Sequence, residues 1–172
     1  MSRHKVDFDL GEFKHFVERL QSAARGGFKD ELTLFMQGLG TEFLRIVEDE
    51  IIRRKVMDTR LLLASFHEGG PDNVWEVSDK GLTLEVGTNV KYAGFVNDGR
   101  WTNPKGVESR FVPGRWRDDR FIYDPSADTG MVLKQQWVEG AHFFESAVRI
   151  FEKMFPDILE AKMQQWLDSY FK

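Results

Sequence analysis

The sequence predicts an α+β protein in which a small antiparallel sheet is packed by N-terminal helices and a long C-terminal helix, with a long irregular loop. Apolar residues recur at intervals of three and four near both ends of the chain, which is typical of amphipathic helices. Between Trp75 and Val86 they alternate with polar residues instead, which indicates strands. From 100 to 137 neither spacing is present, which predicts the loop.

Size and composition predict one globular domain. The chain has 172 residues, of which 41% are hydrophobic and 30% are charged. We expect a single domain, 1–172, made of N-terminal helices (1–57), a short helix and β-hairpin core (58–99), the long loop (100–137) and C-terminal helices (138–172). No apolar run is as long as a signal peptide or a membrane span, so we expect a soluble intracellular protein with no membrane partner.

Two helices are predicted in the N-terminal part of the chain. The first begins after Asp9, a favourable N-cap residue, and ends before a pair of glycines. The second runs from about Phe28 to Met57, and Gly38 and Gly40 weaken its middle by about 1 kcal/mol each relative to alanine. Its far end carries acidic and basic residues at a spacing of four, which indicates a solvated helix end with ion pairs.

The clearest strands form a β-hairpin. A short helix is expected from Asp58 to Phe66, with Asp58 as its cap. The strands follow around Trp75 and from Leu82 to Val86, and they flank a turn at Asp79-Lys80-Gly81. Two further short strands are expected inside the loop, around 121–123 and 131–133.

The C-terminal part carries a long apolar stripe at helical spacing, from Phe144 to Tyr170. Pro156 lies within this stripe. Proline removes a helical hydrogen bond but is well tolerated in a first turn, so we expect it to break or kink the helix and to start a second one.

No combination of residues predicts catalysis, a cofactor or a metal. The four histidines are in no spacing that holds a metal, and His142 fits an ordinary structural role at a helix start. Neither a phosphate-binding nor a dinucleotide-binding glycine motif is present. The absence of cysteine excludes disulfides, thiolate nucleophiles and zinc–thiolate sites. We therefore expect a protein that is not an enzyme and holds no cofactor or metal.

The loop is instead a candidate binding surface. Between 100 and 120 it has six basic residues against three acidic ones, with aromatic residues interleaved. Arginine and aromatic residues together favour a protein interface. The alternative is a nucleic-acid-binding accessory module that uses loop 100–121, which the net charge of −4 disfavours. A third interpretation is that Trp101 and Trp116 only pin the loop to its own domain. The candidate residues are Arg100, Trp101, Arg110, Phe111, Arg115, Trp116, Arg117 and Arg120.

Three segments follow a known pattern: DTRLLLASF (58–66), LEVGTNVKYAGFVNDG (84–99) and GAHFFESAVRIFEKMFPDILEAKMQQWLDSYF (140–171). Together they resemble the phage tail-completion family, small neck proteins of tailed phages and prophages. The family pattern has an Asp-Thr-Gly-x-Leu-x-x-Ser-like segment, a strand that ends in Val-Gly-Thr-Asn, a Tyr-Ala pair and an acidic residue before glycine. A Pro-Phe-like segment then enters a long C-terminal helix. The matching residues are Thr59, Leu61 or Leu62, Ser65, Val86, Gly87, Thr88, Asn89, Tyr92, Ala93, Val96, Asp98, Gly99, Phe143, Phe144 and Ala147.

This resemblance implies a structural role in the virion. Its members act at the head-proximal end of the tail, and the resemblance implies a hexameric ring that caps the tail tube and helps join tail to head. The implied partners are further copies of the chain, the tail tube protein and the head-completion or connector proteins, with assembly in the host cytoplasm. Nucleic acid enters only as DNA that passes through the ring lumen.

Two features depart from the family pattern, and one pair of surfaces fits a ring. Arg60 stands where the family has glycine, which matters only if the backbone there is left-handed. The loop is also much longer than the family connection.

A ring needs two complementary patches in each subunit, and we expect the basic, aromatic loop to meet an acidic helix surface at Glu48, Asp49 and Glu50.

Overall fold

The computed structural model describes Lys14, Val17, 28–56, 60–78 and 83–171. The chain divides into two compact units. The first, Met1–Gly94 with His142–Lys172, is called the helical unit below, and the second, Phe95–Ala141, is called the arm. These limits lie within a few residues of the predicted borders of the loop.

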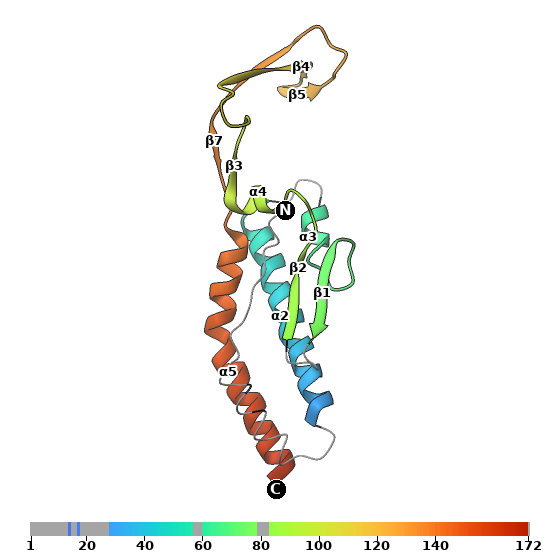
Figure 1. The fold of residues 1–172 in the computed structure, drawn as a ribbon, viewed down its shortest axis with the longest axis vertical. Coiled ribbons are helices and arrows are strands. Elements are labelled where there is room, and N and C mark those ends of the chain that lie inside the picture. Colours follow the sequence, from blue (N-terminus) through green and yellow to red (C-terminus); the bar gives the residue numbers. More distant parts are fainter. Residues whose placement is uncertain (1–13, 15–16, 18–27, 57–59, 79–82, 172) are drawn as a thin grey trace. The chain divides into compact units, whose positions relative to one another are not determined.

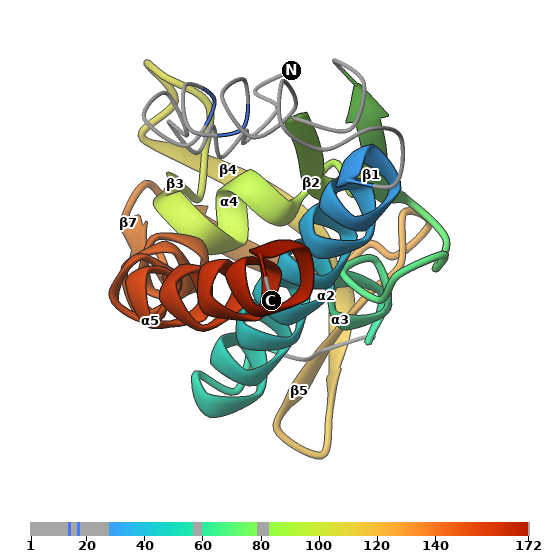
Figure 2. The ribbon, with the colours of Figure 1, turned by 90° about the horizontal axis from the view of Figure 1, so that it is seen from below.

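Two long helices and a β-hairpin make up the helical unit. Helices α2 (Phe28–Arg53) and α5 (Phe143–Phe171) lie side by side, with α3 (Leu61–Ala64), β1 (Asn73–Ser78) and β2 (Thr83–Thr88) beside α2 (Figure 1). The view from below shows the same neighbours (Figure 2). This arrangement confirms the α+β class. The predicted first helix lies almost entirely outside the described residues, although Lys14 and Val17 are helical.

The C-terminal part is one long helix, as the predicted fold class has it, and Pro156 does not start a second helix. Pro156 lies inside α5, and the helix continues on both sides of it. The aromatic contacts of α5 with α2 explain why. Phe151, before the proline, contacts Phe43 at a ring-centroid distance of 5.6 Å, and Trp166, after it, contacts Phe35 at 5.6 Å. Packing against α2 at both points offsets the lost hydrogen bond.

The core of the helical unit is a cluster of phenylalanines from α2, from α5 and from the turn after α3. Phe43 of α2 also contacts Phe144 of α5 at 5.7 Å, and Phe66, just after α3, contacts Phe143 at 6.0 Å. Four of these rings, including Phe43 and Phe66, are almost completely buried. Edge-to-face pairs of this kind add about 0.5–1.5 kcal/mol each to the burial of apolar area.

The predicted hairpin is present, and one glycine allows it to pack on α2. Strands β1 and β2 are antiparallel in a register that pairs Trp75 with Val86, while their turn lies outside the described residues. A Cβ at Gly40 would lie 2.8 Å from the ring of Trp75 and would also meet Leu84. A Cβ at Gly38, in contrast, would have no atom within 4 Å. Of the two glycines that weaken the helix, only Gly40 has a packing reason within the helical unit.

A hydrogen-bond chain joins the hairpin to α3 and includes two residues of the family pattern. The backbone N–H of Val90 donates to the Thr88 hydroxyl at 3.0 Å, and that hydroxyl donates to Ser65 Oγ at 2.7 Å. Ser65 Oγ donates in turn to the Leu62 carbonyl at 2.8 Å. Asn73 closes the arrangement from β1 by donating to the Ser65 carbonyl at 3.0 Å. Thr88 and Ser65 therefore fix the end of the hairpin.

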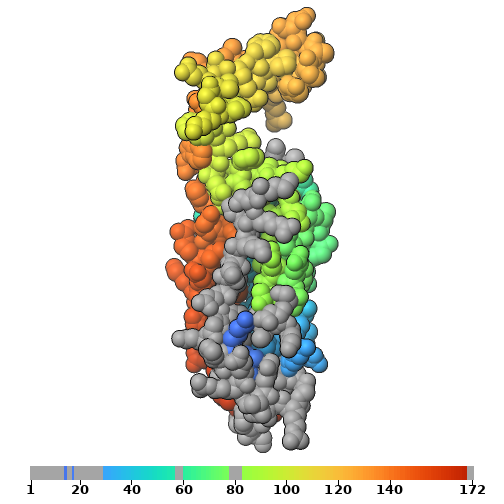
Figure 3. All heavy atoms as spheres, viewed as in Figure 1, coloured from blue at the N-terminus to red at the C-terminus, as the bar shows by residue number. Residues whose placement is uncertain are grey.

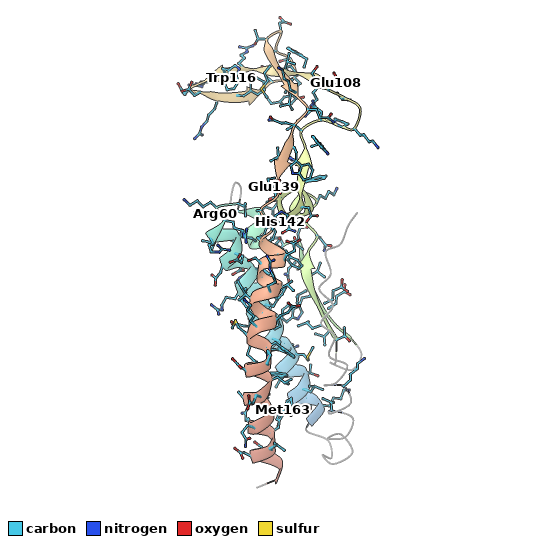
Figure 4. All side chains as sticks on the ribbon, turned by 90° about the vertical axis from the view of Figure 1, so that its left-hand side faces the viewer. Arg60, Glu108, Trp116, Glu139, His142 and Met163 are labelled. Carbon is cyan, nitrogen blue, oxygen red and sulfur yellow. The ribbon has the colours of Figure 1, made fainter. Side chains whose placement is uncertain are left out.

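The turn before α3 is left-handed. Arg60 has φ 61° and ψ −4°, so the departure from the family glycine has a cost of about 1–2 kcal/mol. Thr59 lies outside the described residues. His142, the residue before α5, also has a positive φ, of 50°, and the N–H of Ser146 donates to its carbonyl. Arg60 and His142 lie at the end of the helical unit where α2 ends and α5 begins, while Met163 marks the other half of α5 (Figure 4).

Replacing Gly38 and Gly40 separately by alanine should change stability in opposite directions. Gly38→Ala should stabilise the protein by about 0.5–1 kcal/mol, because it removes a helical glycine where the space is open. Gly40→Ala should destabilise it by about 1–3 kcal/mol, because the new methyl group displaces Trp75 and Leu84. Urea unfolding measures both changes. Two shifts of the same sign would contradict the packing of the hairpin on α2.

Candidate protein interface

The arm consists of strands, which corrects the prediction of a long irregular loop. Strands β3 (Gly99–Trp101) and β7 (Trp137–Glu139) form a two-stranded ribbon. Beyond it, β4 (Ser109–Arg117) lies between β5 (Arg120–Tyr123) and β6 (Gly130–Lys134) in a three-stranded antiparallel sheet. The two short strands predicted inside the loop correspond to β5 and β6. Figure 3 shows the atoms of the arm in yellow and orange.

The ribbon is held by a pair of tryptophans. Trp101 and Trp137 are opposite each other in the register, and their rings meet edge to face at 5.5 Å. Both stay about half exposed, at 57% and 46%. A cross-strand aromatic pair contributes about 0.2–1 kcal/mol, which is important in a ribbon of two strands because such ribbons are marginal alone. Trp101 therefore has a structural contact within the arm as well as an exposed surface.

Polar side chains join the ribbon to the three-stranded sheet. The Thr102 hydroxyl donates to the Lys134 carbonyl at 2.8 Å. The Asn103 side chain is buried, donates to the Leu133 carbonyl at 2.8 Å and accepts a hydrogen bond from Arg110 Nε at 2.9 Å. These contacts satisfy the backbone at the point where β3 and β6 end. They give the predicted interface residue Arg110 a fixed position.

The register divides the three-stranded sheet into two different faces. Paired residues point to the same side and neighbours along a strand to opposite sides. One side, called the basic face, combines basic and apolar residues: Phe111, Pro113, Arg115, Arg117, Arg120, Ile122, Val132 and Lys134. The other, called the apolar face, has Arg110, Val112, Gly114, Trp116, Phe121, Tyr123, Met131 and Leu133.

Two glycines confirm this division. A Cβ at Gly130 would lie 2.6 Å from the ring of Phe111, and one at Gly114 would lie 2.6 Å from the ring of Phe121. Each aromatic ring thus covers a glycine diagonally opposite on its own face, an arrangement that stabilises glycine positions in sheets. Phe121 also meets Trp116 at 5.4 Å across the strands. Because the rings pack along the sheet, Phe111 and Trp116 remain 59% and 64% exposed.

The arginines of the basic face have only weak partners within the arm. Arg115 lies 3.9 Å from Asp124, and Arg117 lies 3.9 Å from Asp118. Exposed pairs at this distance contribute little. The pKa of Asp124 is lowered mainly by the hydrogen bonds that Ser126 donates to it, and Arg115 is the smallest cause. Arg115 and Arg117 are therefore available for other partners, since both side chains are more than 70% exposed.

The residues at the tip of the arm are unfavourable for its local conformation. Asp118 and Asp119 form the two-residue turn between β4 and β5, with φ of 48° and 60°. Positive φ at both positions belongs to a type I′ turn, which Asn-Gly fits best. Arg117 is also directly opposite Arg120, and like charges in such a pair are destabilising.

Sequence reasoning named the arginines and aromatic residues of the arm but missed residues that share their faces. Trp137, Ile122, Val132 and Lys134 were not among the candidates, yet the strand register places them beside the predicted ones. The pairing of β4 with β5 and β6 groups Ile122, Val132 and Lys134 with the predicted residues, and the pairing of β3 with β7 places Trp137 opposite Trp101. For β4 and β5, the equal spacing of Trp116 and Phe121 on either side of Asp118-Asp119 is a sequence signal of the pairing, whereas β4 and β6 are not joined by a turn and have no such signal.

Of the three residues in the predicted acidic surface, Asp49 is exposed, Glu48 is partly exposed and Glu50 is buried. Glu48 lies 3.4 Å from His67, and Asp49 lies 3.6 Å from Arg45. Glu50 is only 4% exposed and therefore does not belong to an open surface. It accepts hydrogen bonds from Arg53 at 2.7 and 2.6 Å and from Arg54 at 3.1 Å. The hydrogen bond from Arg53, followed by those of Ser146 and Arg54, lowers the pKa of Glu50 to about 2 against the effect of burial.

Other acidic residues complete that surface. Glu42 binds Arg45 at 2.6 Å, and Glu68 accepts a hydrogen bond from Thr41 at 2.8 Å. These contacts bring carboxylates from α2 and from the turn after α3 to one surface, called the acidic face: Glu42, Glu48, Asp49 and Glu68. Within the part of the chain that the structure describes, no group of histidines and carboxylates could hold a metal ion, and no helix is long and apolar enough to cross a membrane.

Comparison with known proteins identifies the family. Residues 14–99 match the family described as "Bacteriophage HK97-gp10, putative tail-component". The chain is 47% identical over 159 residues to the uncharacterized protein YqbI of Bacillus subtilis (strain 168), covering 91% of this chain and 95% of YqbI. It is 46% identical over 158 residues to the phage-like element PBSX protein XkdI of the same organism, covering 92% of this chain and 97% of XkdI. The chain belongs to the HK97 gp10-like family of phage tail components. No solved structure matches it.

The arm extends beyond the match to this family of tail components. The match ends at Gly99, where β3 begins. The two Bacillus proteins, in contrast, match more than nine-tenths of the chain, so most of the arm is included in those matches. Most of the sequence of the arm therefore lies outside the family match but within the matches to YqbI and XkdI.

Replacing Glu50 should destabilise the protein in a pH-dependent way. Its pKa of about 2 in the folded protein is below the ordinary value of 4.5, so its contribution is complete above about pH 5 and is lost as the pH falls toward 2. Glu50→Gln should cost about 1–3 kcal/mol at pH 7 and much less at pH 3. Urea unfolding at both pH values measures this. The exposed Asp49→Asn is the control, and an equal loss at both pH values would contradict the buried ion pair.

Replacing Trp137 should loosen the arm alone. Trp137→Ala removes the ring contact with Trp101, which should lower the local stability of the ribbon by about 0.5–1 kcal/mol. Amide exchange in β3 and β7 should therefore become roughly two- to fivefold faster. Hydrogen exchange measured by mass spectrometry should show no change in α2 and α5. Trp116→Ala is the matched control and should leave the ribbon unaffected. Equal acceleration in α2 would show that the arm does not open independently.

Proposed function

We propose that this tail component completes the tail at the head-proximal neck. In this proposal it forms a ring, expected to be a hexamer, that caps the tail tube and helps join the tail to the head. Its partners are further copies of itself, the tail tube protein and the head-completion or connector proteins. It resides in the neck of the virion after assembly in the host cytoplasm. Membership of the phage tail-component family supports this role.

The exposed arm is the observation that supports a ring best. Nine of the fifteen exposed large hydrophobic residues in the described chain lie in the arm: Phe95, Trp101, Phe111, Trp116, Ile122, Tyr123, Val132, Trp137 and Val138. Exposed apolar surface of this kind, beside arginines, is typical of protein interfaces. A closed ring uses two different patches on each subunit, and the arm and the acidic face offer two such patches.

The charge of the arm does not favour the nucleic-acid-binding alternative. Phe95–Ala141 contain seven basic and seven acidic residues, so the arm as a whole is neutral. Proteins that bind nucleic acid through phosphate contacts carry a clear positive excess on the binding element. We therefore keep nucleic acid only as DNA that passes through the lumen of the ring.

Deleting the gene tests the neck role. Electron microscopy of particles from the deleted strain should show separated heads and tails, or tails of abnormal length. Complementation with the wild-type gene should restore joined particles, and this controls for effects on neighbouring genes. Joined particles with tails of normal length in the deleted strain would overturn the proposal.

A further inference from the structure

We propose that the basic face of the arm sheet docks on the acidic face of the helical unit of a second copy of this chain. This inference rests on the proposed ring, because it names the contact between neighbouring subunits. It assigns one face of the arm, rather than the whole arm, to that contact.

The chemistry of the basic face calls for a partner that is both acidic and apolar. Arg115, Arg117, Arg120 and Lys134 provide four positive charges on one side of the sheet. Between them lie three exposed apolar side chains, Phe111, Ile122 and Val132. A polyanion such as nucleic acid would neutralise the charges but would leave the aliphatic side chains in water. A protein surface can cover both.

The acidic face has the complementary composition. Glu42 and Asp49 flank Arg45, which they share, so the face keeps an excess of negative charge. Ile52, one helical turn beyond Asp49 on the same side of α2, is 47% exposed and provides an apolar contact. Because the arm is neutral, the net charge of −4 of the chain lies entirely outside the arm. A second copy of the chain therefore offers the required surface.

The unfavourable tip of the arm supports the same docking. Arg117 and Arg120 repel each other across the strands in the isolated arm. A carboxylate placed between the two guanidinium groups would convert this repulsion into an attraction. Asp49, which is 65% exposed, has the length of side chain and the exposure to enter such a position in a neighbouring subunit.

The absence of cysteine allows a direct cross-linking test. Ile122→Cys on the basic face and Ile52→Cys on the acidic face are made as single variants, one carrying a tag, and mixed under oxidising conditions. The test uses the purified full-length chains and also cells that produce particles. We expect a disulfide between one chain of each kind, since exposed apolar residues that meet in an interface bring their Cβ atoms close.

A neighbouring residue provides the control. Tyr123→Cys is next to Ile122 on the same strand but on the apolar face, so it should cross-link to Ile52→Cys at least tenfold less. A chain with both Ile122→Cys and Ile52→Cys should give a ladder of covalent oligomers. Equal yields from Tyr123→Cys, or disulfides only within single chains, would overturn the proposal.

Charge reversal then separates a specific contact from a general attraction. Arg115→Glu with Arg117→Glu should lower the cross-linking yield at least tenfold, as should Glu48→Lys with Asp49→Lys. Mixing the chain that has the two reversed arginines with the chain that has the two reversed carboxylates should restore the cross-linking yield. Lys105→Glu, outside the two faces, should have no effect. Loss of binding to a fluorescent single-stranded DNA in the arginine variant, with cross-linking unchanged, would overturn the proposal in favour of nucleic acid.

The outcomes remain separate from those of the gene deletion. Cross-linking between the two faces together with normal particles in the deleted strain would retain this contact and reject the neck role. Abnormal particles without cross-linking would retain the neck role and reject this contact.

Discussion

The contact between α2 and α5 through the Phe43 ring is the interaction on which the helical unit depends. Phe43 meets two rings of α5, and this fixes the two long helices against each other. Phe66 then joins α3 to the same cluster, and Ser65, beside it, receives the hydrogen bond of Thr88 from the hairpin. The hairpin can close on α2 because position 40 has no side chain. Each later contact thus requires the geometry that the phenylalanine cluster sets.

The arm is stabilised by different means, because it has no comparable core. The cross-strand pairs of Trp101 with Trp137 and of Trp116 with Phe121 contribute at most about 1 kcal/mol each. At its base, the N–H of Ala141 donates to the Val96 carbonyl at 2.8 Å, which holds the two ends of the arm together. A Cβ at Gly140 would meet the backbone of Asn97 and Asp98, so this closure requires glycine. Aromatic side chains that remain half exposed can serve both the arm and a partner.

The difference between a buried and an exposed strand decided what the sequence could predict. β1 and β2 lie against α2, so one side is apolar and the alternation around Trp75 predicted them. β4 has no buried side except at Gly114, and its apolar and basic residues therefore follow no period that indicates a strand. The expectation that Pro156 starts a second helix is wrong for a related reason. The aromatic packing on both sides of Pro156 is a tertiary effect, which the local sequence does not reveal. Composition identified Arg115 and Trp116 as site candidates, but only the register shows that they lie on opposite faces.

The tip of the arm also shows why local stability is a poor guide to its role. A hairpin selected for stability alone would have Asn-Gly in its two-residue turn and opposite charges across the last pair. This hairpin has Asp118-Asp119 between two arginines that face each other. Sequences that violate local rules at an exposed position retain those residues where they make contacts outside the element itself. The cost is compensated if the arginines meet carboxylates of another surface, because one partner then removes both the repulsion and the exposure of Ile122 beside them. The properties that make this hairpin unfavourable alone are therefore those that an acidic, partly apolar partner would make favourable.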